Sequence, residues 1–227
     1  MKPAIVRRGK FGMERDLSEM IVSARIVGVL LAGGAGRRMG GGDKCLLMLG
    51  GETLLARTIQ SLRPHVGSLV LNANGDPTRF ADYGLPVVAD VIEGFAGPLA
   101  GVLTGMEWAK ANAPGADYVV TVPTDIPFLP ADLVPRLAEA LVLADADIAC
   151  AASGGRDHPV PALWKISLAP RLHADMVERD ARKVDGWTAD QKLARAEWPV
   201  GEIDPFFNVN RQEDLARAAQ LAGLKIY

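Results

Sequence analysis

Residues 29–44 read Val-Leu-Leu-Ala-Gly-Gly-Ala-Gly-Arg-Arg-Met-Gly-Gly-Gly-Asp-Lys. The apolar start, which extends back to Ile26, predicts a buried strand of a parallel sheet. Glycines after such a strand let the backbone turn and approach a ligand closely, so that successive N–H groups can point at one anion. Arg37, Arg38 and Lys44 add the positive charge that a polyphosphate requires. The segment therefore predicts a strand followed by a phosphate-binding loop.

The residue order in this loop differs from three familiar phosphate loops. A Walker loop needs Gly-Lys followed by Ser or Thr, whereas Lys44 lies between Asp43 and Cys45. A dinucleotide fingerprint needs a third glycine where Met39 stands. A kinase loop would be accompanied by His-Arg-Asp and Asp-Phe-Gly segments, which this sequence lacks. The remaining pattern, Leu-Ala-Gly-Gly-x-x-x-Arg-Met-Gly-x-x-x-Lys, resembles the signature of nucleotidyltransferases that move a nucleoside monophosphate onto a phosphorylated acceptor.

Composition limits the function classes. A length of 227 residues with 49% hydrophobic and 23% charged residues suits one globular domain. A formal charge of −2 gives no long-range attraction to nucleic acid or anionic membrane, so any phosphate binding must be local. Cys45 and Cys150 are too few for a disulfide framework or a multi-cysteine metal site. We expect Cys45 to be structural, because no His or Asn forms an obvious constellation with it.

The N-terminal segment lacks the features of a targeting signal. It is basic at Lys2, Arg7, Arg8 and Lys10, but no continuous apolar core or small-residue cleavage site follows. No apolar run in the sequence reaches the length that spans a bilayer. We therefore expect a flexible extension over residues 1–24, a nucleotidyltransferase-like domain over residues 25–227, and a cytoplasmic location.

Hydrophobic periodicity predicts alternating strands and helices. We expect strands over residues 26–31, 68–71, 87–90, 117–122, 147–152, 160–166 and 193–199. We expect helices over residues 52–62, 97–111, 130–143, 168–180 and 212–222. This alternation predicts a single-domain α/β fold with a mostly parallel, doubly wound, Rossmann-like sheet.

Polar or flexible residues lie at the carboxyl ends of four of the expected strands. They are the loop over residues 33–44, Asn72, Asp90 and Asp125. Ligands of such sheets bind outside the carboxyl ends of the strands. We therefore expect these four features to lie together in one site.

Asp125 is the candidate metal ligand. Pro123 and Pro127 flank it and stiffen the backbone that holds its carboxylate. Mg²⁺ prefers one or two carboxylates together with phosphate oxygens and water, so this carboxylate suits Mg²⁺ beside a triphosphate. A helix cap or a turn is the alternative role of Asp125.

The loop cations are candidates for phosphate chemistry. Lys44 is expected to neutralise charge on the nucleotide phosphates, and Arg38 to clamp the leaving pyrophosphate. Arg37 is the alternative clamp, and the alternative role of Lys44 and Arg38 is that of solvated loop cations.

Other polar residues admit two interpretations each. Asp90 could accept hydrogen bonds from a base or ribose or bind a second metal, and a strand-end turn is the alternative. Asn72 is also a frequent turn residue. Asn208 and Asn210 alternate in an extended segment, so their amides share one face that suits a polar heterocycle, with a turn as the alternative.

The histidines are not expected to act as bases. His158, in Asp157-His-Pro159, is tempting as a general base, but a phosphate nucleophile is already ionised near neutral pH. We expect His158 to be structural or to position the acceptor. His65 and His173 are expected on helix surfaces.

Together these motifs make the chain resemble the MobA-type molybdenum cofactor guanylyltransferases over about residues 26–222. The resemblance rests on the following segments: the loop over residues 31–44, Asn72-Ala-Asn74, Asp90, Gly97-Pro-Leu-Ala-Gly101, Pro123-Thr-Asp-Ile-Pro-Phe-Leu-Pro130, Asp157-His-Pro159 and Phe207-Asn-Val-Asn210. Two residues depart from the family pattern, because Cys45 stands where glycine is usual and Thr124 where cysteine is common.

The resemblance implies a reaction and a set of site residues. The reaction joins GMP from Mg-GTP to the terminal phosphate of molybdopterin, also in its molybdenum-loaded form, and releases pyrophosphate. The residues implied for GTP are Leu31, Ala32, Gly33, Gly34, Lys44, Asn72, Asp90 and Asp125. Asp125 would also hold Mg²⁺, Lys44 and Arg38 would act with it in catalysis, and Asn208 and Asn210 would face the pterin.

The resemblance also bounds partners and alternatives. The net charge and the lack of a long apolar run exclude a nucleic acid or membrane partner, and we expect a monomer. The resemblance implies product transfer to molybdoenzymes or their chaperones. One alternative is a cytidylyltransferase of the same fold, although CTP-using relatives resemble Leu-Ala-Ala-Gly at the loop start, where a methyl group narrows the base site. The other alternative is a non-catalytic GTP-binding factor in cofactor delivery.

Overall fold

The described part of the chain forms an α/β domain around one large sheet. The computed structural model describes residues 21–32, 43–94 and 97–223. The sheet has seven strands in the order β5-β4-β1-β6-β8-β7-β9. These strands are β1 (Ile26–Leu31), β4 (Ser68–Asn72), β5 (Val87–Val88), β6 (Tyr118–Pro123), β7 (Ile148–Ser153), β8 (Arg156–Lys165) and β9 (Leu193–Trp198). All neighbouring pairs are parallel except those of β8, which runs antiparallel to β6 and β7.

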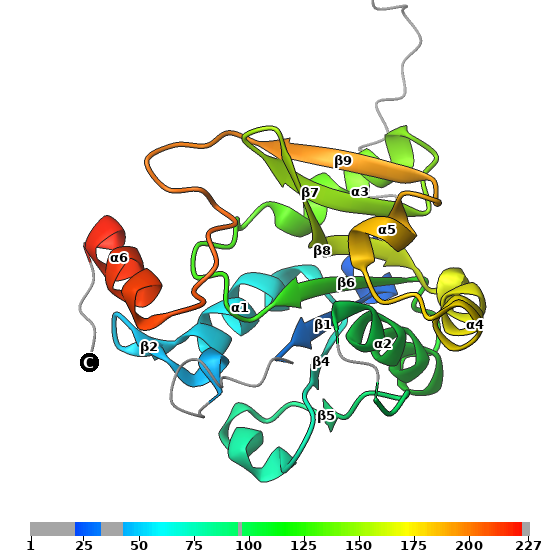
Figure 1. Cartoon of the computed structure of the whole chain (residues 1–227), viewed down its shortest axis with the longest axis horizontal. Coiled ribbons are helices and arrows are strands. Elements are labelled where there is room, and N and C mark those ends of the chain that lie inside the picture. Colours follow the sequence, from blue (N-terminus) through cyan, green and yellow to red (C-terminus); the bar gives the residue numbers. More distant parts are fainter. Residues whose placement is uncertain (1–20, 33–42, 95–96, 224–227) are drawn as a thin grey trace, which may run out of the picture.

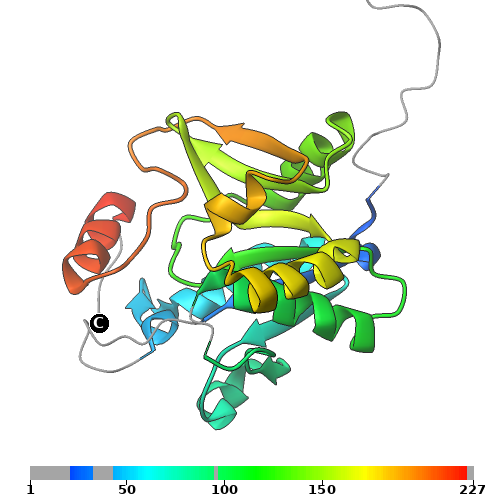
Figure 2. The same ribbon diagram turned by 45° about the vertical axis from the view of Figure 1, so that its right-hand side comes forward.

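Helices cover both faces of the sheet (Figures 1 and 2). One face packs against α1 (Leu54–Leu62) and α3 (Leu133–Leu143), and the other against α2 (Pro98–Asn112), α4 (Ala169–Arg179) and α5 (Val184–Thr188). The last helix, α6 (Gln212–Ala222), packs instead on a small hairpin of β2 (Met48–Leu49) and β3 (Glu52–Thr53). Short 3₁₀ turns lie at Ser23–Arg25, Lys44–Leu46, Arg63–His65, Pro77–Tyr83 and Ile166–Leu168.

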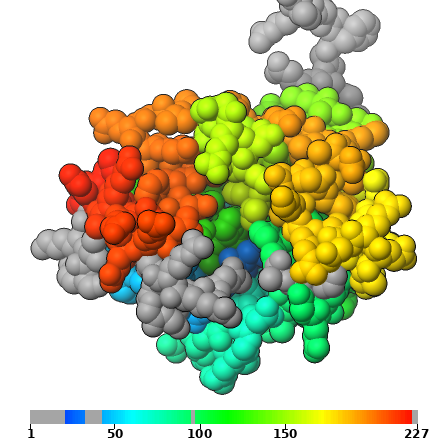
Figure 3. Space-filling model, viewed as in Figure 1, coloured from blue at the N-terminus to red at the C-terminus, as the bar shows by residue number. Residues whose placement is uncertain are grey.

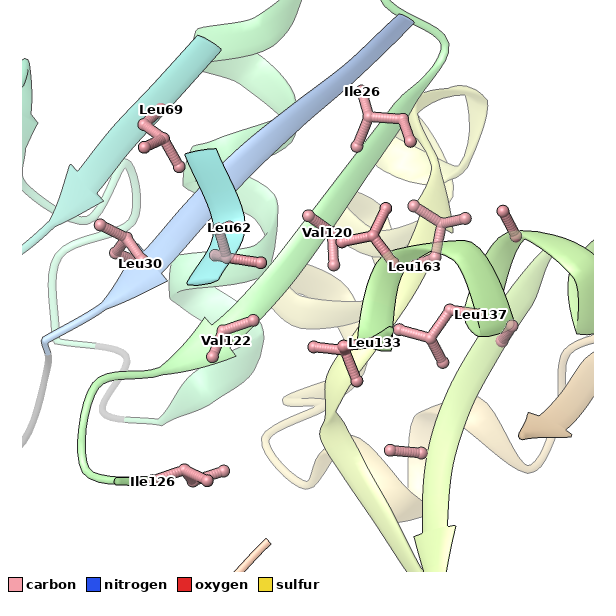
Figure 4. Packing of buried hydrophobic residues seen from close by; sticks show 14 of the residues in the cluster. Ile26, Leu30, Leu62, Leu69, Val120, Val122, Ile126, Leu133, Leu137 and Leu163 are labelled. Carbon is pink, nitrogen blue, oxygen red and sulfur yellow. The ribbon is translucent and has the colours of Figure 1, made fainter. Parts of the chain in front are cut away.

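Alternating side chains of the central strands feed two separate cores. Every residue of β1 is buried, as the apolar run predicts for a central parallel strand. Ile26 and Leu30 belong to the cluster under α1 and α3, whereas Val27 and Val29 belong to the cluster under α2 and α4. Figure 4 shows the first cluster, in which α3 packs on the central strands through Leu133 and Leu137. The predicted doubly wound, mostly parallel fold is therefore confirmed.

Local interactions move several predicted boundaries. The helix predicted from residue 52 begins at Leu54, because Glu52 and Thr53 pair with the strand Met48–Leu49 and the Thr53 hydroxyl caps the helix by accepting from the N–H of Ala56 at 3.1 Å. The helix predicted from residue 130 begins at Leu133, because the N–H of Leu133 bonds to the carbonyl of Pro130 in a preceding turn.

Tertiary pairing changes two further elements. The strand predicted over residues 160–166 starts at Arg156, since β8 forms a hairpin with β7. The strand predicted over residues 87–90 is only Val87–Val88. The β2–β3 hairpin and α5 were not predicted. The final helix has the predicted bounds.

The predicted N-terminal extension is described only in its last part. Residues 1–20 lie outside the described residues. Ile21 is 6% exposed and belongs to the core cluster under α1 and α3. The packed chain therefore includes Ile21, before the predicted boundary at residue 25. Among the described residues, no helix combines the length and the apolar character that crossing a bilayer requires.

A substitution at Gly105 tests how closely α2 packs on the sheet. A Cβ at this position would lie 2.4 Å from Val29 Cγ2 and 2.8 Å from Val29 Cγ1, both on buried β1. Gly105→Ala is expected to lower the free energy of unfolding by about 1–3 kcal/mol through overpacking, despite the better helix propensity of alanine. Urea denaturation measures this change.

Gly186 in α5 provides the matched control. The nearest atom to a Cβ there is Lys183 Cβ at 3.8 Å, which is ordinary contact. Gly186→Ala is expected to change the free energy of unfolding by less than about 1 kcal/mol, in the stabilising direction. Equal stabilisation by both substitutions would contradict the close packing of α2 on β1.

Candidate active site

A cleft of about 830 Å³ opens at the carboxyl ends of the parallel strands. Residues that follow β1, β4, β5 and β6 line it, as does Asn208 from the segment before α6. Figure 3 looks onto a recess in which atoms in the blue of β1 are visible. The cleft lies at the edge of the sheet where the sequence predicts ligand binding.

The structure brings most of the predicted site residues together. Those that line the cleft are Leu31, Ala32, Lys44, Asn72, Asp90, Asp125 and Asn208. Asn210 joins them through its contact with Lys44. Gly33, Gly34, Arg37 and Arg38 lie outside the described residues.

Asp125 carries the unsatisfied charge of the site. Its Oδ1 atom is buried and accepts no hydrogen bond from any described residue. Burial raises the pKa of this carboxyl, and the nearby Lys44 ammonium opposes the rise. An unpartnered buried carboxylate oxygen is costly in a folded protein unless a ligand uses it. The carboxylate therefore fits a cation that completes its shell with phosphate oxygens and water.

Thr124 fixes the strand ends next to this carboxylate. The Thr124 side chain is buried, and its hydroxyl donates to the carbonyl of Leu31 at 3.1 Å. The backbone N–H of Thr124 bonds to the same carbonyl at 3.2 Å. The threonine that replaces the family's usual cysteine thus ties the end of β6 to the end of β1.

The segment before α6 reaches both Asp125 and Lys44. The N–H of Val209 donates to the backbone carbonyl of Asp125 at 2.8 Å, and Lys44 Nζ donates to Asn210 Oδ1 at 3.0 Å. Asp214 in the first turn of α6 accepts from the N–H of Asn210 at 2.8 Å. These contacts hold Lys44 and Asn210 beside the carboxylate across a large sequence separation, which no local sequence signal predicts.

Asn72, Asn74 and Asp90 form a second polar cluster. Asn72 Nδ2 donates to Asp90 Oδ1 at 2.9 Å, and Asn74 Nδ2 donates to Asp90 Oδ2 at 2.8 Å. The N–H of Asp90 returns a bond to Asn74 Oδ1 at 2.9 Å. Each Asp90 oxygen keeps acceptor capacity for a further donor, such as a ribose hydroxyl or a base N–H.

Gly101 allows α2 to approach this cluster. A Cβ at residue 101 would lie 2.4 Å from Asn72 Oδ1 and 2.6 Å from Leu31 Cδ2. Because both neighbours line the cleft, a larger residue at position 101 would displace cleft-lining side chains.

Arg79 is a site-supporting residue that sequence reasoning missed. Its Nε lies 2.7 Å from Asp43 Oδ2, next to Lys44, and its guanidinium donates to the carbonyl of Asn74 at 2.6 Å. The arginine thus joins the residue before Lys44 to the end of β4. A lone arginine in a short 3₁₀ turn carries no sequence signal for this contact.

Three expectations about sulfur and imidazole groups can be compared with the structure. Burial raises the pKa of the Cys45 thiol to about 12, so the thiol stays protonated, in agreement with a structural role. His158 is absent from the residues that line the cleft. His173 is exposed on α4, whereas His65 is half-buried in the 3₁₀ turn after α1 rather than on the helix itself.

The fold and the cleft define the class of protein. A cation, a buried carboxylate with free acceptor capacity and a polar amide–carboxylate cluster lie at the carboxyl edge of a Rossmann-like sheet. These groups can bind the phosphates and the nucleoside of a nucleotide. They define a nucleotide-binding α/β protein of the nucleotidyltransferase class.

Comparisons with known proteins give the family. The model of the MobA-like NTP transferase domain matches residues 28–193, and the chain belongs to this family of nucleotidyltransferases. A molybdenum cofactor guanylyltransferase of Bradyrhizobium sp. (strain ORS 278) is 52% identical over 200 residues, which cover 88% of this chain and 94% of the relative. A protein of the same name from Rhodopseudomonas palustris (strain HaA2) is 54% identical over 194 residues, covering 86% and 91%.

Solved structures share the fold. The crystal structure of the molybdopterin-guanine dinucleotide biosynthesis protein A from Archaeoglobus fulgidus superposes with a TM-score of 0.67 at 21% sequence identity. It covers 87% of this chain and 98% of its own. At this identity the likeness extends to the fold alone.

The buried charge of Asp125 predicts a pH-dependent cost to stability. Burial raises the pKa of the folded carboxyl above its unfolded value, so folding favours the protonated form. The cost is absent below the unfolded pKa, grows as pH rises towards the folded pKa, and is constant above it. In metal-free buffer, Asp125→Asn should therefore raise the free energy of unfolding at pH 7, by about 1.4 kcal/mol per unit of pKa shift.

Urea denaturation between pH 3.5 and 8 measures this difference. The gain from Asp125→Asn is expected to shrink as pH falls, because both proteins then carry a neutral group. Asp190→Asn, at an exposed position of the same residue type, is the control and should change little at any pH. A loss of stability in Asp125→Asn at pH 7 would show that the carboxylate is better satisfied than the structure indicates.

Proposed function

We propose that this chain transfers GMP from GTP to the terminal phosphate of molybdopterin, also in its molybdenum-loaded form, with release of pyrophosphate. The observation that carries the proposal is the Oδ1 atom of Asp125, which is buried and has no hydrogen-bond partner among the described residues, in a cleft that Lys44 also lines. Relatives about half identical to this chain are named molybdenum cofactor guanylyltransferases, and these names support guanylyl transfer in the making of the molybdenum cofactor.

In this proposal Asp125 holds Mg²⁺. The donor set fits, because one rigid carboxylate, with an oxygen that no residue in the described part of the chain uses, suits an ion that takes its other ligands from phosphates and water. When bound, Mg²⁺ neutralises charge on the triphosphate. Thr124 keeps the carboxylate in place through its two hydrogen bonds to the carbonyl of Leu31.

Lys44 and the Asn72–Asp90 cluster bind the nucleotide. Lys44 Nζ supplies positive charge where negative charge develops on the phosphates. Asp90, which Asn72 orients, accepts hydrogen bonds from the nucleoside. Leu31 and Ala32, which also line the cleft, lie against the nucleoside. Arg38 as a clamp on pyrophosphate, and Gly33 and Gly34 as backbone donors, remain predictions.

The acceptor side is assigned to Asn208 and Asn210. Asn208 lines the cleft, and Asn210 accepts a hydrogen bond from Lys44. The acceptor phosphate would therefore approach the nucleotide phosphates between Lys44 and the two asparagines. The acceptor phosphate is already ionised near neutral pH and needs no general base. Catalysis then rests on positioning and electrostatics supplied by the chain.

The proposal extends to the proteins that receive the product, to the oligomeric state and to the location of the enzyme. Molybdoenzymes or their chaperones would receive it from a monomeric, cytoplasmic enzyme. These three points stay predictions.

Pyrophosphate release tests the proposal directly. The full chain supplied with GTP, Mg²⁺ and molybdopterin should release pyrophosphate and form a guanine dinucleotide, with GTP preferred over CTP in competition. Asp125→Ala should lower turnover by about 100-fold or more while the protein stays folded. Asp190→Ala is the matched control and should keep full activity.

Other results would redirect the assignment. Preference for CTP would make the chain a cytidylyltransferase. GTP binding without pyrophosphate release in the presence of acceptor would identify a non-catalytic binding factor. Near-normal turnover of Asp125→Ala would remove Asp125 from the metal site.

The Lys44–Asn210 contact predicts a charge effect on nucleotide binding. Asn210→Asp would place a carboxylate beside Lys44 Nζ, which Asn210 Oδ1 contacts at 3.0 Å. This carboxylate would compete with the triphosphate for the lysine, and GTP affinity should fall by about 10-fold. Isothermal titration with GTP and Mg²⁺ measures the change. Asn208→Asp carries the same charge change without a Lys44 contact in the structure and should weaken GTP binding less; equal losses would contradict the prediction.

A further inference from the structure

His158 takes part in a hydrogen-bonded chain that lies outside the cleft. Ser153 ends β7, His158 lies on β8, and Asp204 lies in the connection between β9 and α6. Ser153 Oγ is 2.7 Å from His158 Nε2 and donates to Asp204 Oδ1 at 2.9 Å. In Figures 1 and 2 the connection, drawn in orange, runs from β9 to α6. The chain therefore joins the β7–β8 hairpin to this connection.

The direction of the hydrogen bonds follows from the donors present. Ser153 is 1% exposed and has one hydroxyl proton, which goes to the acceptor-only carboxylate of Asp204. His158 Nε2 must then carry a proton and donate to Ser153 Oγ. Burial lowers the pKa of His158, which favours the neutral ring, and the bond to Ser153 then places the one ring proton on Nε2.

Asp204, which accepts the hydrogen bond from Ser153, also bonds to the backbone of the residues that follow it. Its Oδ1 also accepts from the N–H of Phe206 at 2.9 Å, and its carbonyl accepts from the N–H of Phe207 at 3.0 Å. Asp204 thus closes a turn over residues 204–207. Ser153 and His158 set the position of that turn relative to the sheet.

Aromatic packing supports the same turn. The His158 ring lies 4.7 Å from the ring of Phe206, which is 3% exposed. Phe206 in turn packs against Trp198 in a T-shaped arrangement, with 5.3 Å between the ring centroids. His158 therefore contacts the connection twice, through Ser153 and through Phe206.

Asn208 lies between two segments that hydrogen bonds fix in place, and the turn over residues 204–207 is the first anchor. The second anchor is the bond from the N–H of Val209 to the carbonyl of Asp125, together with the bond from the N–H of Asn210 to Asp214. Asn210 is thus held from the α6 side. The position of Asn208, which lines the cleft, depends in addition on the turn at Asp204.

We propose that His158 is a positioning residue that acts through Ser153 and Asp204 to place Asn208 against the phosphorylated acceptor substrate. This inference rests on the proposed function for the identity of the acceptor. It assigns no proton transfer to His158.

Two variants break the chain and one preserves it. His158→Ala removes the ring and the donor, and Ser153→Ala removes the link to Asp204. His158→Gln keeps an N–H donor near the position of Nε2 and should restore most of the lost function. His173→Ala, at an exposed histidine on α4, is the matched control.

Steady-state kinetics separate positioning from simple stability. In His158→Ala and Ser153→Ala, the KM for molybdopterin should rise by about 10-fold, as expected for one lost buried hydrogen bond. The Kd for GTP and the kcat at saturating acceptor should stay within about twofold. A purely structural role would lower the Tm and leave the acceptor KM of the folded protein unchanged, which would overturn the proposal. An equal rise in the GTP Kd would also overturn it.

Hydrogen exchange tests the chain without substrate. Peptides that cover residues 204–210 should exchange faster in His158→Ala and Ser153→Ala than in the wild type, His158→Gln or His173→Ala. Unchanged exchange in these peptides would overturn the proposal. If a broken variant fails to fold, Asp204→Ala, which removes the oxygen that accepts from Ser153 and from the N–H of Phe206, replaces it in both measurements, and an unchanged result there counts against the proposal. If the wild type transfers no nucleotide, the proposed function fails, and exchange alone then decides whether His158 positions the connection.

Discussion

The site is organised around a carboxylate oxygen that the described part of the chain leaves without a hydrogen bond. Asp125 Oδ1 is buried, and the Lys44 ammonium offsets only part of the cost of keeping it there. Several contacts with backbone carbonyls hold the chain around this carboxylate in place. Thr124 joins β6 to β1, and Val209 closes the other side by bonding to the Asp125 carbonyl. Such a fixed and unsatisfied charge is what a metal–phosphate complex would satisfy.

Small residues on α2 complement this arrangement. Gly105 lets the helix rest on Val29 in the middle of β1, and Gly101 lets its first turn approach Asn72 at the cleft. The same helix therefore packs closely on β1 and also contacts the side chain of Asn72, whose amide orients Asp90. Stability and site geometry are coupled here because one close contact between helix and sheet serves both.

The sequence predicts those parts of the molecule that local pattern controls. The alternation of apolar runs and helical periodicity predicts the doubly wound sheet, and the strand ends predict that Asn72, Asp90 and Asp125 converge. The bond between Lys44 and Asn210 joins residues 166 positions apart, and the ion pair between Arg79 and Asp43 is likewise tertiary. No local pattern encodes such contacts. The late start of α3 at Leu133 has a similar cause, because a turn at Pro130 outcompetes helix propensity.

A crystal structure with a non-hydrolysable GTP analogue and Mn²⁺ in place of Mg²⁺ tests the central claim most directly. Anomalous scattering should locate the ion within coordination distance of Asp125 Oδ1 and next to the triphosphate, with Lys44 Nζ turned from Asn210 onto a phosphate oxygen. A triphosphate bound elsewhere, or an ion in the cleft that leaves Asp125 Oδ1 without a ligand, would contradict the account.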